Sequence, residues 1–330
     1  MKSQDKLEEI IKRMSGDKEP RDIIREENKR LQEQFIKQFI KDSDGNLKPG
    51  IVSATTDDNG TYEGELVNKK KEGKGILCYS SGDFYIGEWK NDNYNGNGMY
   101  MFEKGERYVG DLKGGNREGF GTYYYENGNK YEGNWINNTK HGKGIYTYHK
   151  SNEKYDGEWD GGFKQGKGIF IFSNGDEYHG DFSKGYKEGK GQIIYGSKAV
   201  FKGEWINDSA NGQGEITYPN GDKYEGNFSR SKKDRNGIYT FNNGTVYDGE
   251  FKDDVFEGYG KMIYSNGDIY EGFFEKGLRS GNGKYTYANG DRYDGEWLMD
   301  KKHGKGTVCQ KNGKGQSVVC TDGKIELDKL

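Results

Sequence analysis

One short stretch of this sequence nearly spells a phosphate-binding loop. Residues 161–168 read Gly-Gly-Phe-Lys-Gln-Gly-Lys-Gly, with glycines and a lysine at the spacing that cradles phosphate oxygens. Such a loop also needs a Ser or Thr after the lysine to hold magnesium, and a helix after that. Gly168 stands in that place instead, and the flanking residues alternate as they do in strands. We therefore interpret the stretch as a by-product of a sequence repeat.

The histidines, cysteines and carboxylates also fall short of a catalytic or metal-binding pattern. His141 and His303 occupy the same place in a repeated unit, and no Cys-x-x-Cys pair occurs. Residues 42–45, Asp-Ser-Asp-Gly, resemble a calcium loop only in part, because the glycine comes two places too early. The other carboxylates alternate with lysines on an expected solvated face, where nothing desolvates one of a pair. We expect no enzyme activity, no metal and no cofactor.

The composition suits a thin, repetitive structure rather than a compact domain. The 330 residues include 54 glycines, and only 30% are hydrophobic, so aromatic rings must supply much of the buried surface. A net charge of −3 predicts no strong attraction to nucleic acid. Three cysteines are too few for a disulfide framework, and neither a signal sequence nor a long apolar run occurs. We expect a soluble intracellular protein.

Residues 1–49 differ from the rest and predict a helical N-terminal arm. Leu7, Ile10, Ile11 and Met14 follow the spacing of an amphipathic helix. After an interruption at Gly16-Asp17, a second helix begins at Pro20 and runs to about residue 41. This arm either folds back over the first strands of its own chain or protrudes and pairs with a helix of another chain. Its candidate contact residues are Ile24, Leu31, Phe35 and Phe39.

From residue 62 onward the chain repeats one unit eleven times. The starts of the units are 23 residues apart, except that Tyr131 and Tyr155 are 24 apart. A fixed period of this size marks an array of one small supersecondary unit. We number positions within a unit from its first aromatic residue, which is position 0. These residues are Tyr62, Tyr85, Tyr108, Tyr131, Tyr155, Tyr178, Phe201, Tyr224, Tyr247, Tyr270 and Tyr293.

Each unit predicts a β-hairpin. Its first half reads Tyr-x-Gly-x-Trp and its second half Gly-x-Gly-x-aromatic-x-aromatic, both with the two-residue alternation of a strand. Asn-Gly pairs such as Asn127-Gly128 separate the units and predict turns. The tryptophans all stand at position 4, and we expect them to form the structural core. They are Trp89, Trp135, Trp159, Trp205 and Trp297.

The glycine spacing also predicts a register within each hairpin. Symmetric pairing sets the glycine of position 2 opposite that of position 13, and the Trp of position 4 opposite the glycine of position 11. A large ring can then cover backbone that has no β-carbon beneath it. The same register pairs position 3 with position 12, so that Glu158 faces Lys167, Glu204 faces Gln213 and Glu296 faces Lys305.

Residues of this type at this spacing resemble the MORN repeat, and the match covers residues 62–308. The resemblance implies an all-β repeat array: an open, single-layer antiparallel sheet of about eleven hairpins forming an elongated twisted rod. Residues 50–61 resemble a degenerate capping half-repeat, and residues 309–330 predict a C-terminal capping hairpin. Local departures include Arg235, which replaces a glycine at position 11.

The sheet face opposite the tryptophans carries a broken apolar strip. A fully solvated face would present Lys and Thr there, so the strip predicts a site for an extended segment or a helix of a partner. The alternative is that sheet curvature closes over some of these residues, or that the N-terminal helices lie on the first few. Its residues are Ile76, Met99, Met101, Phe120, Tyr124, Ile145, Ile169, Ile171, Ile194, Tyr259, Ile263 and Phe273.

The resemblance implies a non-enzymatic structural scaffold for protein–protein interaction. A nearly all-repeat chain with a short helical arm is most similar to MORN proteins of cilia and flagella, especially of the radial spoke head. We therefore expect partners within a large axonemal assembly of the cytoskeleton, with homo- and hetero-oligomers both open. The alternative is a membrane-cortex module that binds phosphoinositides. Lipid binding needs a basic stripe, whereas Glu alternates with Lys along most units here, so we disfavour it.

Overall fold

The structure is a computed structural model that describes residues 20–57 and 59–327. The first amphipathic helix expected at Leu7–Met14 lies outside these residues. The chain divides into two compact units, Met1–Ser173 and Asn174–Leu330, which we describe separately. The boundary falls inside the repeat array, where the sequence shows no break in its period.

The first unit holds an N-terminal helical segment followed by eleven strands. The helix α2 spans Pro20–Phe35 and continues into one π-helical turn, η1, at Ile36–Ile40, in agreement with the predicted second helix. The strands are β1 (Val52–Thr55), β2 (Thr61–Val67), β3 (Lys70–Cys78), β4 (Phe84–Lys90), β5 (Asn93–Met101), β6 (Arg107–Lys113), β7 (Asn116–Tyr124), β8 (Lys130–Ile136), β9 (Thr139–Thr147), β10 (Lys154–Asp160) and β11 (Phe163–Ile171).

The second unit consists of strands alone among its described residues. It ends in the predicted hairpin, in which Val319 pairs with Glu326. The strands are β12 (Glu177–Ser183), β13 (Tyr186–Ile194), β14 (Val200–Ile206), β15 (Ser209–Thr217), β16 (Lys223–Ser229), β17 (Lys232–Thr240), β18 (Val246–Lys252), β19 (Val255–Ile263), β20 (Ile269–Glu275), β21 (Leu278–Thr286), β22 (Arg292–Leu298), β23 (Lys301–Cys309), β24 (Gly315–Thr321) and β25 (Lys324–Leu327).

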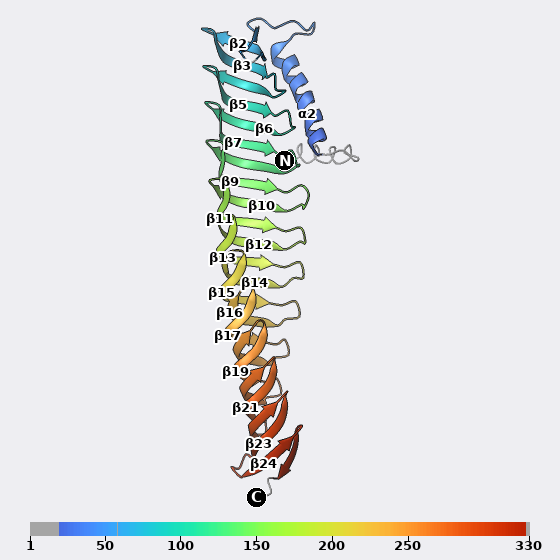
Figure 1. The fold of residues 1–330 in the computed structure, drawn as a ribbon, viewed down its shortest axis with the longest axis vertical. Coiled ribbons are helices and arrows are strands. Elements are labelled where there is room, and N and C mark those ends of the chain that lie inside the picture. The colour runs from blue at the N-terminus through green and yellow to red at the C-terminus, as the bar shows by residue number, and fades with distance from the viewer. Residues whose placement is uncertain (1–19, 58, 328–330) are drawn as a thin grey trace. The chain divides into compact units, whose positions relative to one another are not determined.

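Within each unit every strand pairs antiparallel with the next along the chain, so the sheets are open meanders (Figure 1). The two strands of a repeat meet in a two-residue turn in which both residues have positive φ, as at Asn137 (46°) and Asn138 (67°). This primed turn matches the twist of the flanking strands. The Asn-Gly pairs lie between repeats as predicted, in wider loops where, for example, Tyr125 N–H donates to Asn129 O at 2.9 Å. None of the described helices has the length and apolar content needed to cross a membrane.

The predicted glycine pairing is confirmed, but the predicted tryptophan pairing is wrong. Gly133 pairs with Gly144, after which an irregularity shifts the register, so that Trp135 pairs with Lys140 rather than Gly142 within its hairpin. Gly142 lies at the irregularity with a φ of 60°. The glycine that Trp135 does face, Gly119, belongs to the preceding repeat. The sequence reasoning missed the shift because it assumed symmetric pairing over the whole hairpin.

The register shift also corrects the three predicted charge pairs. Glu158 faces Lys143 of the preceding repeat rather than Lys167, with their charged groups 3.0 Å apart. A position-3 carboxylate instead covers the backbone that the shift leaves unpaired, as where Phe120 N–H donates to Asp111 Oδ2 at 3.0 Å. In the same way Glu204 faces Lys190, not Gln213, and Glu296 faces Asn282, not Lys305.

The rings that cover the paired glycines belong to the tyrosines of position 0, which corrects a second expectation. A Cβ added to Gly144 would clash with the ring of Tyr131, which is fully buried. The Tyr131 hydroxyl donates to Asn134 O at 3.0 Å, and the other position-0 tyrosines donate likewise to position 3. All five tryptophans are buried as predicted. Trp159 donates from Nε1 to Gly144 O at 2.9 Å and so ties two repeats together.

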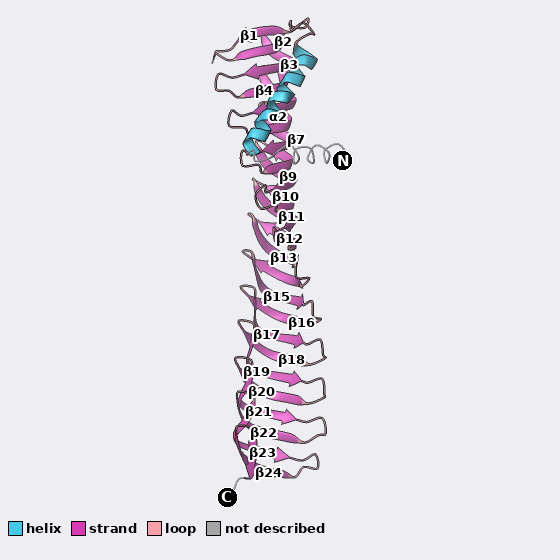
Figure 2. Cartoon of the chain, turned by 90° about the vertical axis from the view of Figure 1, so that its right-hand side faces the viewer, coloured by secondary structure: helices cyan, strands magenta, loops and turns pink. Residues whose placement is uncertain are grey.

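The N-terminal helical segment lies along the first unit's own sheet (Figures 1 and 2). It contacts Ile76 and Ile86, which alternate with the glycine and tryptophan positions and so lie on the face opposite the tryptophans. Ile40, Ile76 and Ile86 form a buried cluster between segment and sheet. Farther along α2, the guanidinium of Arg107 lies 2.9 Å from the Glu27 carboxylate and donates to Asn28 Oδ1 at 3.1 Å. The fold-back interpretation of the arm is therefore confirmed for its described part, and no described helix protrudes.

Candidate functional site

Part of the predicted partner strip is covered by the chain itself. Ile76 and Met101 are buried, and Met99 packs against the same cluster beneath η1. The ring of Tyr124 stacks under the Arg107 guanidinium at 4.1 Å. Over these repeats the N-terminal segment occupies the place that the sequence analysis assigned to a partner, so these residues do not form a free surface.

The remaining residues of the strip are scattered. In the first unit, Phe120 and Ile169 are exposed, whereas Ile145 and Ile171 are half-buried. In the second unit, Tyr259 and Phe273 face each other edge to face, with ring centroids 5.6 Å apart, and each is about half exposed. Ile263 is also exposed, and Ile194 is half-buried. The structure thus joins one aromatic pair but no continuous strip.

The candidate contacts of the helical arm point into the molecule. Ile24 is buried, and Phe35 and Phe39 pack on the Ile40 cluster. Phe39 also lies beneath the Lys74 ammonium at 3.9 Å. Leu31 is half-buried on the same helix. The arm is therefore a cover for the sheet rather than an open docking helix.

The tryptophan face of the first unit carries a continuous row of rings that the sequence analysis did not single out. Neighbouring members come from positions 15 and 17 of successive repeats, and their ring centroids are 4.6 to 6.3 Å apart. Most of these rings are half-buried, so part of their surface remains accessible to solvent. We name this row the aromatic ladder; it comprises Tyr79, Tyr100, Phe102, Tyr123, Tyr125, Tyr146, Tyr148, Phe170 and Phe172.

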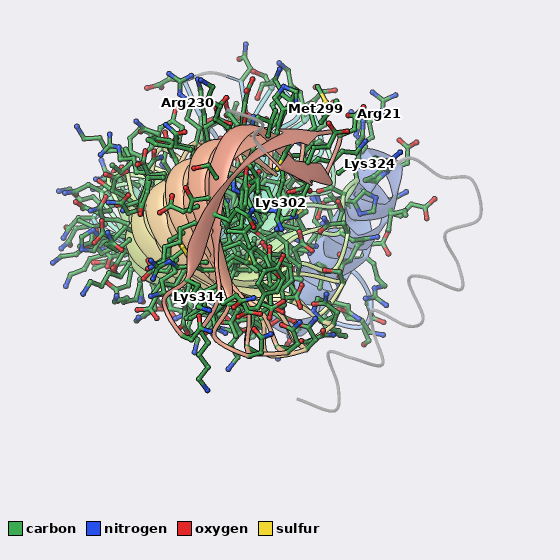
Figure 3. The ribbon with its side chains drawn as sticks, turned by 90° about the horizontal axis from the view of Figure 1, so that it is seen from below. Arg21, Arg230, Met299, Lys302, Lys314 and Lys324 are labelled. Atoms are coloured by element: carbon green, nitrogen blue, oxygen red, sulfur yellow. The ribbon has the colours of Figure 1, made fainter. Side chains whose placement is uncertain are left out.

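A row of cations accompanies the rings on the same face. The residue at position 9 of most repeats is Lys or Arg. Where the next repeat has a Trp at position 4, the charge lies over that ring, as with Arg117 over Trp135 (4.5 Å) and Lys187 over Trp205 (4.6 Å). In the second unit, Figure 3 shows Lys302 of this row inside the curve of the strands and Met299 at its rim. Cations over aromatic faces are attracted by the ring quadrupole. The two-residue alternation of a strand could have revealed this row in the sequence, because positions 9, 13 and 15 share one face of the sheet.

Cavities of the first unit open on this same face. One of about 230 Å³ is lined by Tyr94, Tyr100, Phe102 and Arg117 among others. Another of about 360 Å³ includes Tyr79 and Trp89. The indole Nε1 of Trp89 is buried without a hydrogen-bond partner in the described part of the chain, unlike that of the other tryptophans. The tryptophan face is therefore the hollowed one.

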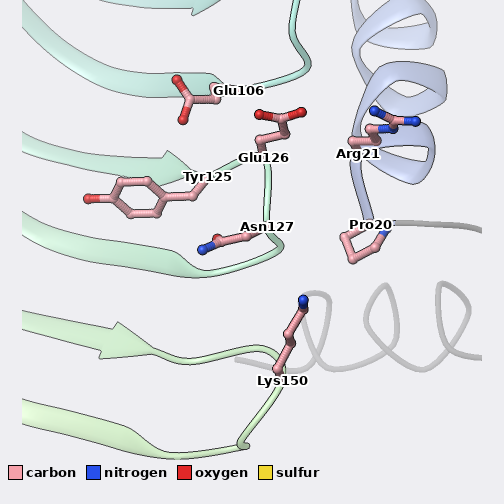
Figure 4. Close-up of a pocket in the computed structure, with 7 residues that line it drawn as sticks. All are labelled: Pro20, Arg21, Glu106, Tyr125, Glu126, Asn127 and Lys150. Carbon is pink, nitrogen blue, oxygen red and sulfur yellow. The ribbon is translucent and has the colours of Figure 1, made fainter.

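A larger cavity lies at the sheet edge beside the start of α2. It has a volume of about 580 Å³, and Figure 4 shows Pro20 and Arg21 of the helix facing Glu126 and Asn127 of a loop across it. Glu106, Tyr125 and Lys150 complete its lining. Both signs of charge meet there without a buried reactive group, so this cavity offers no recognisable chemistry.

Two buried aspartates in loops have pKa values lowered by hydrogen bonds. Burial raises the pKa of Asp222, but hydrogen bonds from Tyr239, the Asn242 N–H and Asn220 outweigh it and leave the pKa lowered. The Tyr285 hydroxyl lowers the pKa of Asp268 in the same way. Both carboxylates link a loop to the next repeat. Within the described residues, no three His, Cys, Asp or Glu side chains are placed to hold a metal ion.

Comparison with known families finds the MORN repeat. The family described as "MORN repeat" matches eleven consecutive segments, which begin at the same residues as the repeats read from the sequence. The segments are 62–84, 85–107, 108–130, 131–153, 155–177, 178–200, 201–223, 224–246, 247–269, 270–292 and 293–315. No curated protein sequence matches this chain.

Solved structures resemble this chain only distantly. The TCP10 domain of Danio rerio CPAP, in complex with a peptide of Danio rerio STIL, is 12% identical, with 83% of this chain and 99% of that chain covered and a TM-score of 0.36. Virginiamycin B lyase of Staphylococcus aureus is 13% identical, with 82% and 85% covered and a TM-score of 0.14. At these scores the likeness carries no argument about function.

Proposed function

Because this chain belongs to the MORN repeat family, we propose that it is a non-enzymatic scaffold that binds other proteins along its aromatic ladder. The observation that carries the proposal is the row of half-buried rings and cations on the hollowed face of the first unit. Rings that are rigid and partly exposed contribute much contact area at low conformational cost. No comparable grouping of reactive side chains occurs among the described residues.

We further propose that the partners belong to a ciliary axoneme complex such as the radial spoke head. The support is the resemblance of a nearly all-repeat chain with a short helical arm to MORN proteins of cilia and flagella. Localisation to the axoneme of the cytoskeleton follows from the same resemblance. Analogy at the level of the fold indicates a cellular location to test, but it does not identify a partner.

Cross-linking of native axonemes followed by mass spectrometry tests this proposal. We expect the chain in the axonemal fraction, with cross-links from lysines beside the ladder, such as Lys140 and Lys164, to other axonemal proteins. A Tyr146→Ala/Tyr148→Ala variant should lose these partners, whereas Tyr259→Ala/Phe273→Ala on the opposite face of the second unit should keep them. Absence of the chain from axonemes would contradict the ciliary assignment, and full retention of partners by the ladder variant would contradict the binding face.

We do not favour the phosphoinositide alternative, because lysines on the face opposite the tryptophans are paired with carboxylates. Lys143 lies 3.0 Å from Glu158, and Lys261 lies 3.1 Å from Glu271. Paired charges leave no basic stripe on that face for an anionic membrane. Co-sedimentation with phosphoinositide vesicles at physiological salt separates the two functions, since a scaffold of this kind stays in the supernatant.

A further inference from the structure

In several repeats the cation at position 9 has a carboxylate supplied by the second turn residue of the next repeat. Lys71 lies 3.8 Å from Asp92, Lys233 lies 3.8 Å from Asp254, and Arg279 lies 3.0 Å from Asp300. The turn residue also donates its backbone N–H to the carbonyl of the position-9 residue. The two positions are therefore neighbours in space, and the carboxylate neutralises a cation seated on aromatic rings.

Repeats without a cation at position 9 lack the carboxylate as well. Tyr94 and Phe256 occupy that position in two repeats, and the corresponding turn residues are Gly115 and Gly277. Where a carboxylate stands at this turn position, the preceding repeat carries a cation. The carboxylate then lies near that charge and also accepts the backbone N–H of the same residue, as from Lys71 N to Asp92 Oδ1 at 2.9 Å.

Lys140 in the first unit is a cation of this row without such a carboxylate. The corresponding turn residue is Gly162, whose N–H donates to Lys140 O at 3.0 Å but which has no side chain. The Lys140 ammonium lies over Trp159 (4.4 Å), Tyr146 (4.9 Å) and Tyr131 (5.6 Å). Within the described part of the chain it makes no hydrogen bond and no ion pair. Burial, with repulsion from Lys164 added, lowers the pKa of Lys140 to about 8.

We propose that Lys140 is the docking point for a carboxylate of a partner peptide that lies along the aromatic ladder in the polyproline II conformation. The carboxylate takes the place that Asp92 or Asp254 fills elsewhere in the array. This inference rests on the proposed scaffold function and names the class of partner: an acidic, proline-rich segment.

The spacing of the repeats argues for this conformation. Successive repeats advance by two strands, or roughly 9.6 Å at a strand spacing of about 4.8 Å. Three residues of polyproline II rise about 9.3 Å and bring the chain back to the same side. An extended β-strand turns every second residue to the opposite side, so its third residue points away. A polyproline II peptide therefore presents the same side to each successive repeat.

The surroundings of Lys140 fit the same ligand. Lys164 stands one repeat further along, over Phe170 at 4.6 Å, and adds positive charge along the path of the peptide. Tyr146, Tyr148 and Phe170 form the adjoining part of the ladder, with centroids 4.6 and 6.1 Å apart. Aromatic-lined grooves are the usual receptors of proline-rich segments, because such segments lose little entropy on binding.

The test measures binding of synthetic peptides to the full chain by titration calorimetry. The probe is a peptide of repeated Glu-Pro-Pro triplets. One control peptide carries Gln-Pro-Pro triplets, which remove the charge, and another carries Glu-Gly-Ser triplets, which keep the charge but not the conformation. We expect each control to bind at least about tenfold more weakly, a factor that corresponds to about 1.4 kcal/mol. Raising the salt concentration should weaken the Glu-Pro-Pro complex.

The decisive variant is Gly162→Asp, which supplies the missing carboxylate from within the chain. Asp occupies the same turn position with similar φ at Asp92 (66°) and Asp254 (73°). A Cβ on Gly162 would meet only Thr139, at 3.6 Å, so the turn has room for it. We expect this variant to bind the Glu-Pro-Pro peptide about tenfold more weakly, as Lys140→Gln should. The matched control, Gly161→Asn in the same turn, should bind like the wild type.

Two results overturn the inference. One is equal affinity for the glutamate and glutamine peptides; the other is unchanged affinity in Gly162→Asp while circular dichroism shows that the variant folds. If the peptides fail to bind but cross-linked axonemal partners are still lost in the Tyr146→Ala/Tyr148→Ala variant, the inference fails and the proposed scaffold function stands. If that variant keeps its axonemal partners and still binds the peptide, the result contradicts both the inference and the proposed function.

Discussion

At the scale of single residues, the position-0 tyrosine has two roles. Its ring fills the space over two glycines, and its hydroxyl donates to the position-3 carbonyl beside the register shift, as from Tyr247 to Glu250 O at 2.8 Å. A buried carbonyl without a donor is costly. Phe201 alone has the ring without the hydroxyl among the position-0 residues. The repeat therefore tolerates loss of the hydrogen bond but keeps the ring.

The variant Phe201→Tyr should stabilise the chain. The new hydroxyl reaches the Glu204 carbonyl, and a hydrogen bond of this kind contributes about 1 kcal/mol. The reciprocal change Tyr131→Phe removes the bond to Asn134 O and should cost about as much. Urea denaturation followed by tryptophan fluorescence measures both. Equal stability of Phe201→Tyr and the wild type would show that water already serves the Glu204 carbonyl.

A second residue-scale prediction concerns Arg235, which takes the place of a glycine with a φ of 56°. L-residues are strained in this left-handed region by about 1–2 kcal/mol. Arg235→Gly should therefore raise the free energy of unfolding by about 1 kcal/mol after the greater freedom of an unfolded glycine is allowed for. Gly258→Ala, at the same position with a φ of 67°, should change stability in the opposite sense. A lower melting temperature for Arg235→Gly would contradict the strain argument.

At the scale of elements, the N-terminal segment substitutes for a second layer over the first repeats. The sheet face beneath it carries Ile76, Ile86 and Met99, which solvent would otherwise reach. Ile40 is fully buried at the contact. The segment is held at its other end by the Arg107–Glu27 ion pair. An apolar contact at one end and a polar one at the other fix how the segment lies on the sheet.

Truncation of Ile40 should loosen this element. Ile40→Ala removes buried methyl groups and leaves a cavity, at a cost of about 2–5 kcal/mol. We expect faster hydrogen exchange at Pro20–Phe35 and at the β3 and β4 strands, while the second unit remains protected. Lys37→Ala, on the exposed side of the same turn, is the matched control and should change nothing. Uniform loss of protection in both units would mean that the segment is not a local cover.

At the scale of the whole molecule, both units share one core chemistry, and that makes their stability depend on alkaline pH. Burial raises the pKa of Tyr85 and Tyr131 in the first unit and of Tyr247 and Tyr270 in the second above the ordinary value of 10.0. Between the ordinary and the raised pKa, the folded chain retains protons that the unfolded chain has released. Stability is therefore complete below pH 10 and declines as the pH rises above it.

The prediction is a steep fall of the urea midpoint above about pH 10. Absorbance at the tyrosinate band should rise together with unfolding measured by circular dichroism, because the core hydroxyls ionise only when the chain opens. Lys140 acts in the opposite direction, since its lowered pKa favours the fold as the pH rises past about 8. One lysine does not offset many tyrosines. Tyrosinate formation well below the unfolding transition would contradict the burial of these hydroxyls.

Spacing along the chain was enough to predict the repeats, the hairpins and the Gly133–Gly144 pairing, because strand alternation and turn chemistry are local. The arrangement of Trp135, Glu158 and Lys140 was decided only in three dimensions. A register shift at a glycine with positive φ turns each of these side chains toward a neighbouring repeat. The periodicity within one repeat does not predict such a shift. The cover formed by α2 likewise depends on a contact between segments far apart in sequence. That Lys140 faces a residue without a side chain is likewise visible only in three dimensions, because that residue, Gly162, comes from the next repeat.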